Sequence, residues 1–380
     1  MKRLMAAVGL LSGGLLLYEL TLTRVFAVVL FSDLAHLALS VAMLGLGIGA
    51  MIQQVYQPIR EDNLNRMVSG LTLGQALATV FAVFCALNFP LLEAGGTGLH
   101  DQAWLRRAAE RFSAMRWGWF TALIPALSLP PILAGLTLSG VFEHRRQALG
   151  KLYGADLMGA AAAAVVFLPA VAWLRGPDAV WLSALCCAIA AAVIAPTGRP
   201  RTIAGVSGAA SALAVGIALS GTGLLQIRAA AGWTNGTILE TRWTALTRLS
   251  VLDEGEKDMI LLDNATLSTV VEVPRHLNPI ANMANRSLVY EIGVPKGRVA
   301  VLAASAGPDV ATAIAHGFDE IDAIDIEGEI FALVAERYDG PLNPYRSDKV
   351  RQVVSDARSA MMRAPSNHYT IIQLVNANLF

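Results

Sequence analysis

Charge is scarce in this chain. Only 15% of its 380 residues are Asp, Glu, Lys or Arg, whereas soluble globular chains average about 25%. The deficit lies in residues 1–223, where short charged islands separate long apolar runs, while from Arg228 onward charges recur every few residues. This asymmetry predicts two domains in two solvents, a membrane and water.

The chain also lacks net charge and has few cysteines, and each of these features argues against a class of function. The 29 basic and 29 acidic residues cancel, so no bulk attraction to nucleic acid is expected. The cysteines are Cys85, Cys186 and Cys187; all lie in apolar runs and none forms a Cys-x-x-Cys pair. We interpret them as small buried residues, and we expect neither a disulfide nor a metal site.

Seven segments are long and apolar enough to cross a membrane, which takes about 20 residues. They are Leu4–Leu30, Leu34–Tyr56, Met67–Leu91, Trp117–Phe142, Tyr153–Leu174, Ala179–Ala195 and Ile203–Gly221. The first is too long for a signal peptide and lacks a clear small-x-small cleavage site. Pro125, Pro130 and Pro131 should kink the fourth, which is tolerated if neighbouring helices bond the freed carbonyls. Residues 93–116 predict a helix in the membrane interface.

Four ionisable residues lie in or near these segments: Glu19, Arg24, His36 and Asp156. Such groups are costly in a membrane and usually face the bundle interior. Glu19 and Arg24 are about 140° apart around a helix and should not pair with each other. His36 and Asp156 are therefore candidate partners. Both interpretations, bonds between helices and a ligand or proton role, remain open.

Glycines cluster in the second and fifth segments, at Gly45, Gly47, Gly49, Gly154 and Gly159. Because lipid provides no hydrophobic drive between helices, close backbone approach is a main source of their association energy. These glycines predict tightly packed helix pairs.

Basic residues between the segments favour a cytoplasmic N-terminus by nine to five. The nine are Lys2, Arg3, Arg60, Arg66, Arg145, Arg146, Lys151, Arg199 and Arg201, and the five are Arg106, Arg107, Arg111, Arg116 and Arg175. Seven helices would then place the C-terminal domain outside the cytoplasm, and a miscounted helix would reverse this. The side of the C-terminal domain stays open.

The second half predicts a β-hairpin followed by an alternating α/β region. Residues 249–253 and 259–263 form the hairpin around a turn at 254–257; residues 264–271 continue it, and a helix follows near 278–292. Strands are then predicted at 299–304, 320–326, 350–355 and 369–374, with helices at 309–316, 329–338 and 357–362. The fold class is thus an α-helical transmembrane bundle of about seven helices (1–223), a linker and β-hairpin (224–290), and a partial Rossmann-like domain (291–380).

In parallel α/β sheets, ligands bind at the carboxyl ends of the strands. Here that edge would carry residues 304–307, Asp325 and Asp356. An acidic residue that ends the second strand is the usual partner of a ribose diol, although a surface Asp at a strand end is an equally good interpretation of Asp325.

Several motifs together resemble a known family. They are Tyr18-Glu19-Leu20, Thr23-Arg24, His36, Leu44–Gly49, Tyr153–Ala160, Trp243–Arg248, Arg298–Val310, Ile324–Ile326, Ser355–Ser359 and Tyr369–Leu374. Over nearly its whole length the chain resembles the membrane-anchored spermidine-synthase-like proteins of bacteria, in which a membrane bundle is fused to an aminopropyltransferase-type, methyltransferase-like domain.

The resemblance implies binding of S-adenosylmethionine or its decarboxylated form, and transfer of the aminopropyl group to an amine such as putrescine. Gly307 and Asp309 would belong to the loop under the amino-acid end of the cofactor, Asp325 would hold the ribose, and Asp356 would lie near the adenine. It also implies a multi-pass protein of the bacterial cytoplasmic (inner) membrane.

Three departures separate the chain from this family. The family loop has the form Gly-x-Gly-Gly-Gly-Arg-Asp, whereas this chain has Ala303-Ala-Ser-Ala-Gly-Pro-Asp309. Residues 374–378 carry no acid where aminopropyltransferases place their catalytic aspartate, so no catalytic residue is assigned. The sequence also stops at Phe380, before the further strands of a complete domain.

Three functions follow as alternatives. The first is a non-catalytic subunit or scaffold of a membrane complex, with lipids and other membrane-protein subunits as partners. The second is a membrane-tethered aminopropyltransferase or related S-adenosylmethionine-dependent transferase. The third is a transporter or small-molecule sensor that uses Glu19, Arg24, His36 and Asp156.

Overall fold

The computed structural model describes residues 1–29, 35–89, 116–227, 237–253, 258–262, 266–269, 284–338 and 343–374. The chain divides into two compact units, Met1–Thr234 and Asn235–Phe380. The predicted interfacial helix of residues 93–116 lies almost wholly outside the described residues.

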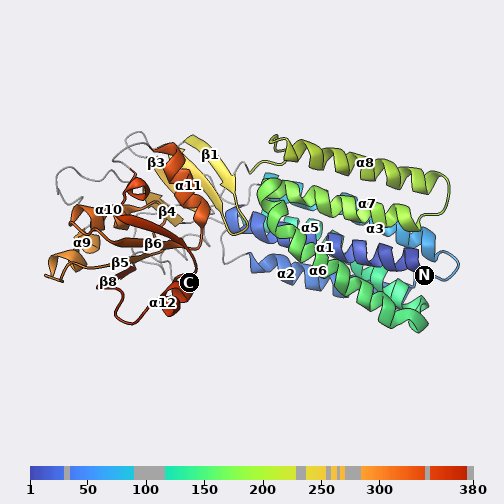
Figure 1. The fold of residues 1–380 in the computed structure, drawn as a ribbon. Coiled ribbons are helices and arrows are strands. Elements are labelled where there is room, and N and C mark those ends of the chain that lie inside the picture. Colours follow the sequence, from blue (N-terminus) through green and yellow to red (C-terminus); the bar gives the residue numbers. More distant parts are fainter. Residues whose placement is uncertain are drawn as a thin grey trace. The chain divides into compact units, whose positions relative to one another are not determined.

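Within its described residues, the first unit contains seven helices that are long and apolar enough to cross a membrane, as the sequence predicts. They are α1 (Lys2–Val29), α2 (His36–Tyr56), α3 (Leu64–Asn88), α5 (Trp117–His144), α6 (Leu149–Trp173), α7 (Val180–Ile194) and α8 (Arg199–Leu219). In Figure 1 these helices run alongside one another. Short 3₁₀ turns precede α6 (Arg146–Ala148) and α7 (Pro177–Ala179).

Four helices form the interior of the bundle and three lie outside them. The inner helices are α1, α3, α5 and α7, and the outer helices α2, α6 and α8 pack on α5, α1 and α7 respectively. At two of these contacts the backbones touch. A Cβ at Gly159 of α6 would overlap the carbonyl oxygen of Gly9 on α1, and a Cβ at Gly49 of α2 would overlap that of Ile132 on α5. The prediction of tight glycine contacts is thus confirmed for Gly49 and Gly159, and also for Gly45, whose Cβ would lie 2.6 Å from Pro131. It is wrong for Gly47 and Gly154, where a Cβ would meet no atom within 4 Å.

The three prolines of α5 leave carbonyls without their usual helical partners. Pro131 has no N–H to offer the carbonyl of Leu127, four residues earlier. The Tyr18 hydroxyl of α1 donates to this oxygen at 2.8 Å. A neighbouring helix thus satisfies a carbonyl that the proline frees, which is the condition under which the sequence predicts prolines to be tolerated.

The second unit begins with a four-stranded antiparallel sheet in the order β1-β2-β3-β4. Its strands are β1 (Thr237–Trp243), β2 (Arg248–Asp253), β3 (Asp258–Leu262) and β4 (Thr266–Thr269). The predicted hairpin is present as β2 and β3, with Val251 opposite Ile260. Strand β1 is not predicted from the sequence.

A four-stranded parallel sheet follows in the order β7-β6-β5-β8. The chain passes through α9 (Ala284–Glu291), β5 (Val299–Leu302), α10 (Pro308–Ala315), β6 (Ile321–Asp325), α11 (Gly328–Arg337), a 3₁₀ turn (Pro344–Arg346), β7 (Val350–Val354), α12 (Ala357–Arg363) and β8 (Ile371–Leu374). The predicted alternation of strands and helices is confirmed.

Helices cover both faces of the parallel sheet. Val301 and Ala323 point to one face and share a core with Val310 of α10 and Val334 of α11, a core that also includes Val251 of the antiparallel sheet. Alternate residues such as Ala300 and Ile324 point to the other face, toward α12. Because both faces are covered, β5 is apolar and buried along its length. Strand β6 is also buried, but it carries two acidic residues, Asp322 and Asp325.

Candidate functional site

The carboxyl edge of the parallel sheet brings three predicted positions together. The loop of residues 303–307 follows β5, Asp325 ends β6, and Asp356 lies two residues beyond β7. Because all four strands are parallel, these segments leave the sheet at the same edge. The residues after β8 lie outside the described part of the chain.

The loop after β5 has a left-handed backbone at every second residue. The φ angles are 54° at Ala303, 49° at Ser305 and 91° at Gly307. A Cβ at Gly307 would also lie 2.5 Å from Cγ of Pro344, so glycine is required there on two grounds. Ala303 and Ser305 each adopt a conformation that costs a residue with a Cβ about 1 kcal/mol.

Asp325 uses its carboxylate to hold this loop. Its Oδ2 accepts a hydrogen bond from the backbone N–H of Ser305 at 2.9 Å, and its Oδ1 accepts one from that of Glu327, also at 2.9 Å. The residue is only 9% exposed. Burial raises the pKa of the Asp325 carboxyl above its ordinary value, although these backbone donors oppose the shift. Both oxygens are thus engaged within the protein.

The hydroxyl of Tyr345 donates hydrogen bonds to the backbone of this loop. Its hydroxyl lies 2.5 Å from the carbonyl oxygen of Ser305 and 3.1 Å from that of Ala304, and its ring is buried. Tyr345 lies in the 3₁₀ turn Pro344–Arg346, and the side chain of Asn343 caps this turn by accepting a hydrogen bond from the Tyr345 N–H at 2.9 Å. Sequence reasoning missed Tyr345 because it lies in an irregular segment some forty residues from the loop.

Asp309 faces the interior of the unit. It is 3% exposed, lies in the first turn of α10, and accepts a hydrogen bond from the Gln373 side chain of β8 at 3.2 Å. The Tyr290 hydroxyl of α9 bonds to the same glutamine. Asp309 therefore links α10, β8 and α9.

Asp356 is exposed and begins α12. Its carboxylate accepts a hydrogen bond from the backbone N–H of Ser359 at 2.9 Å. This hydrogen bond lowers the pKa of the Asp356 carboxyl. Of the three predicted cofactor-binding aspartates, Asp356 is the one that faces solvent.

The segment from Trp243 to Arg248 attaches the antiparallel sheet to this edge. The Thr244 hydroxyl donates to the Glu327 carboxylate at 2.6 Å, and Glu327 also accepts from the Glu329 N–H at the start of α11. Nearby, Arg242 of β1 forms ion pairs of 2.6–2.9 Å with Glu240, Glu329 and Glu336. Sequence reasoning picked out this segment only through the resemblance.

The four polar residues predicted in or near the membrane segments lie on three helices, α1, α2 and α6. Asp156 accepts a hydrogen bond from Ser12 of α1. Glu19 and Arg24 are half-buried on α1, and His36 is exposed at the first residue of α2. The pairing of Asp156 joins α1 to α6 and supports a packing role for that residue.

No metal site is found among the described residues, where no three His, Cys, Asp or Glu side chains gather closely enough to hold an ion. All three cysteines are free thiols. Cys85 and Cys187 are buried, as the sequence interpretation expects, whereas Cys186 is half-buried.

Comparison of the chain with protein-family models, with curated proteins and with solved structures finds no match.

Proposed function

We propose that this chain is a multi-pass protein of the bacterial inner membrane, with a Rossmann-like, spermidine-synthase-like second unit, and that it serves as a non-catalytic subunit or scaffold of a membrane complex. Seven long apolar helices support the membrane location. The parallel strand order β7-β6-β5-β8 is that of a doubly wound nucleotide-binding half, which supports the Rossmann-like assignment.

The observation that carries the non-catalytic assignment is the use of the acidic residues. Asp325, which would hold a ribose, accepts hydrogen bonds from the backbone N–H groups of Ser305 and Glu327 at its two carboxylate oxygens and is only 9% exposed, which leaves little of it open to a ligand. Asp309 is buried against Gln373. The edge that would bind a cofactor is instead tied together by its own side chains, which favours a domain kept for its shape.

Calorimetry on the purified full chain tests this proposal. S-adenosylmethionine and its decarboxylated form, each titrated to millimolar concentration, should give no saturable heat, while amide hydrogen exchange shows that β5 and β6 are protected. In mild detergent, the chain should purify with a partner in fixed stoichiometry, measured by native mass spectrometry. Saturable heat, or a chain that purifies alone from its native membrane, would contradict the proposal.

The second candidate is a membrane-tethered S-adenosylmethionine-dependent transferase. It is favoured by the shared edge on which the loop, Asp325 and exposed Asp356 meet. If wild-type protein gives saturable heat, Asp356→Ala should weaken it and Asp325→Asn should abolish it. Asp325→Asn keeps one acceptor oxygen for the loop, so hydrogen exchange at Ser305 separates a lost ligand contact from a lost fold.

A further inference from the structure

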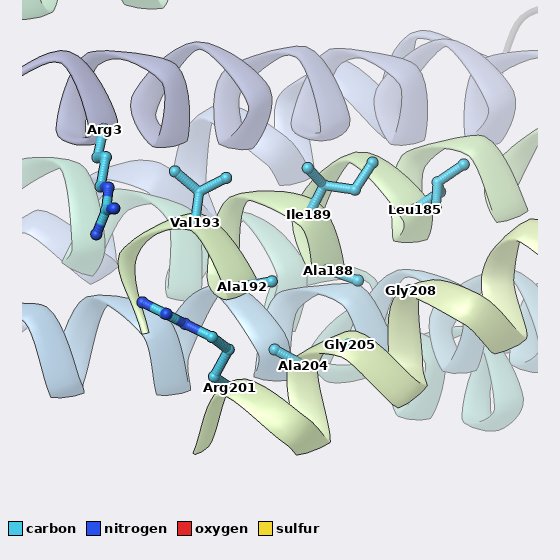
Figure 2. Close-up of a pocket in the computed structure, with 10 residues that line it drawn as sticks. All are labelled: Arg3, Leu185, Ala188, Ile189, Ala192, Val193, Arg201, Ala204, Gly205 and Gly208. Carbon is cyan, nitrogen blue, oxygen red and sulfur yellow. The ribbon is translucent and has the colours of Figure 1, made fainter. Parts of the chain in front are cut away.

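A groove runs along α7 between α1 and α8. It has a volume of about 660 Å³, and Figure 2 shows the side chains that line it. Leu185, Ile189 and Val193 follow one face of α7 at four-residue intervals, so the apolar wall extends for about 12 Å. Small residues of α7 and α8, among them Gly205, form the rest of the lining.

The groove exists because α8 is seated less closely than the other outer helices. Gly159 and Gly49 bring α6 and α2 into backbone contact with their neighbours. On α8, a Cβ at Gly208 would lie 3.8 Å from that of Ala188, an ordinary contact, and a Cβ at Gly205 would meet no atom within 4 Å. The glycines of α8 therefore leave open space along α7, whereas Gly159 and Gly49 bring their helices into direct contact with a neighbour.

Two arginines stand at one end of this apolar groove. Arg3 of α1 and Arg201 of α8 reach toward that end from opposite sides (Figure 2). Arg201 donates to the carbonyl oxygen of Ala195 at the end of α7 at 2.8 Å, and its buried Nε has no hydrogen-bond partner among the residues that the structure describes. The guanidinium is thus held in place through Nη2.

The acidic residues at this end of the bundle are partly engaged elsewhere. Leu4, Ile59, Val141 and Ile194 share one apolar cluster, so the loop after α2 and the end of α5 lie at the same end as the start of α1. There Glu61 pairs with Arg145 at 2.5 Å, and Glu143 accepts from Gln53 at 3.0 Å.

We propose that this groove binds an anionic phospholipid, with its phosphate on Arg3 and Arg201 and an acyl chain along Leu185, Ile189 and Val193. Guanidinium groups match phosphate oxygens in geometry as well as charge. Two arginines with no carboxylate in the lining favour a headgroup that carries net negative charge over a zwitterionic one. The inference rests on the bundle lying in a membrane, not on the role of the second unit.

Native mass spectrometry of the detergent-solubilised full chain tests the lipid. The chain is exposed to equal amounts of dioleoyl-phosphatidylglycerol and dioleoyl-phosphatidylcholine, and retention of phosphatidylglycerol is expected to dominate. Arg3→Ala with Arg201→Ala should reduce that preference about thirtyfold, and either single change about fivefold. Arg199→Ala is the matched control, because this exposed arginine starts the same helix without lining the groove, and the preference should be unchanged.

A second variant tests the groove without touching its charge. Gly205→Leu places a side chain in the open space and should displace the lipid while the helix stays intact, since leucine favours helix more than glycine does. Gly216→Leu is its control: the same helix, the same substitution, and again no atom within 4 Å, but outside the groove.

The outcomes separate the inference from its premises. Equal retention of the two lipids by the wild-type chain, or equal loss in Arg199→Ala and Arg201→Ala, would overturn it. Binding of glycerol 3-phosphate alone with similar affinity would show a headgroup site and overturn the role of the apolar wall. A chain that leaves the membrane on carbonate extraction would instead overturn the membrane location, and the cofactor titration remains an independent test of the second unit.

Discussion

The helical bundle and the α/β unit of this protein are held together by different means. In the bundle, the closest contacts join backbone to backbone, as where Gly159 meets Gly9, and polar side chains mostly bond to nearby carbonyls. In the α/β unit, buried carboxylates bond to arginines or to backbone N–H groups, as Asp322 and Asp325 do. Close backbone packing is the kind of contact that associates helices when lipid surrounds them, whereas paired charge and apolar burial stabilise a unit in water.

The largest loss of stability should come from a substitution at the contact between α1 and α6. Gly159→Ala places a Cβ on the carbonyl oxygen of Gly9. Because this Cβ is fixed to the backbone of α6 and the oxygen belongs to the backbone of α1, α6 must move away from α1. We expect a loss of roughly 3 kcal/mol in unfolding free energy in mixed micelles. Gly154→Ala on the same helix meets no atom within 4 Å and should be neutral or slightly stabilising. Equal stability of the two variants would refute glycine-mediated seating of α6.

A smaller effect should come from the buried charge in the second unit. Asp322 is fully buried and bonds to Arg351 at 2.6 and 2.9 Å and to the Tyr369 hydroxyl at 2.8 Å. Asp322→Asn should cost about 2 kcal/mol, a value reduced from that of a fully buried pair because Arg351 is largely exposed. Hydrogen exchange of β6 and β7 amides in the full chain measures it, and unchanged protection would contradict the role of Asp322.

The same residue gives the second unit an acid sensitivity that its neutral variant should lack. Burial alone would raise the pKa of Asp322, but the hydrogen bonds from Arg351 and Tyr369 outweigh it and lower that pKa. The stability that Asp322 contributes is therefore present above its unfolded pKa of about 3.9 and is lost as pH falls below it toward the lowered folded value. Protection of β6 should drop below about pH 4 in the wild type and change less in Asp322→Asn.

The smallest effect should be an increase in the stability of the second unit. Ser305→Gly relieves a left-handed residue whose N–H still bonds Asp325, and should stabilise the second unit by about 0.5–1 kcal/mol. Ala306→Gly is the control in the same loop, because Ala306 does not have a positive φ and glycine there should be destabilising. A loss of protection at β5 in Ser305→Gly would show that the serine side chain matters more than the backbone.

Much of the fold follows from local patterns. All seven apolar segments are helices, and each predicted strand of the parallel sheet is present within two residues of its expected ends. Both kinds of element can be recognised locally, the helices from the length of their apolar runs and the strands from short apolar runs between turn residues. Strand β1 was missed because residues 237–243 do not alternate. Its place depends on pairing with β2 and on the carboxylates around Arg242.

The candidate site was predicted less completely. The sequence located Gly307, Asp325 and Asp356 at one edge of the sheet, since strand ends and acidic residues can be found locally. It could not indicate that Asp325 bonds the loop, that Asp309 turns inward to Gln373, or that Tyr345 supports Ser305. Each of these contacts joins residues far apart in the chain, and a hydrogen bond between them leaves no periodic trace.

Taken by itself, the sequence determined seven long apolar helices, the succession of strands and helices along the second half of the chain, and the positions of the glycines, because hydropathy, period and backbone freedom are properties of neighbouring residues. Only the tertiary structure decided which glycines touch a neighbour and which, like Gly205, leave a groove open, and which carboxylates remain free for a ligand. Those outcomes depend on tertiary contacts between residues that are far apart in the chain. Such a contact contributes free energy only once the fold has brought both residues together.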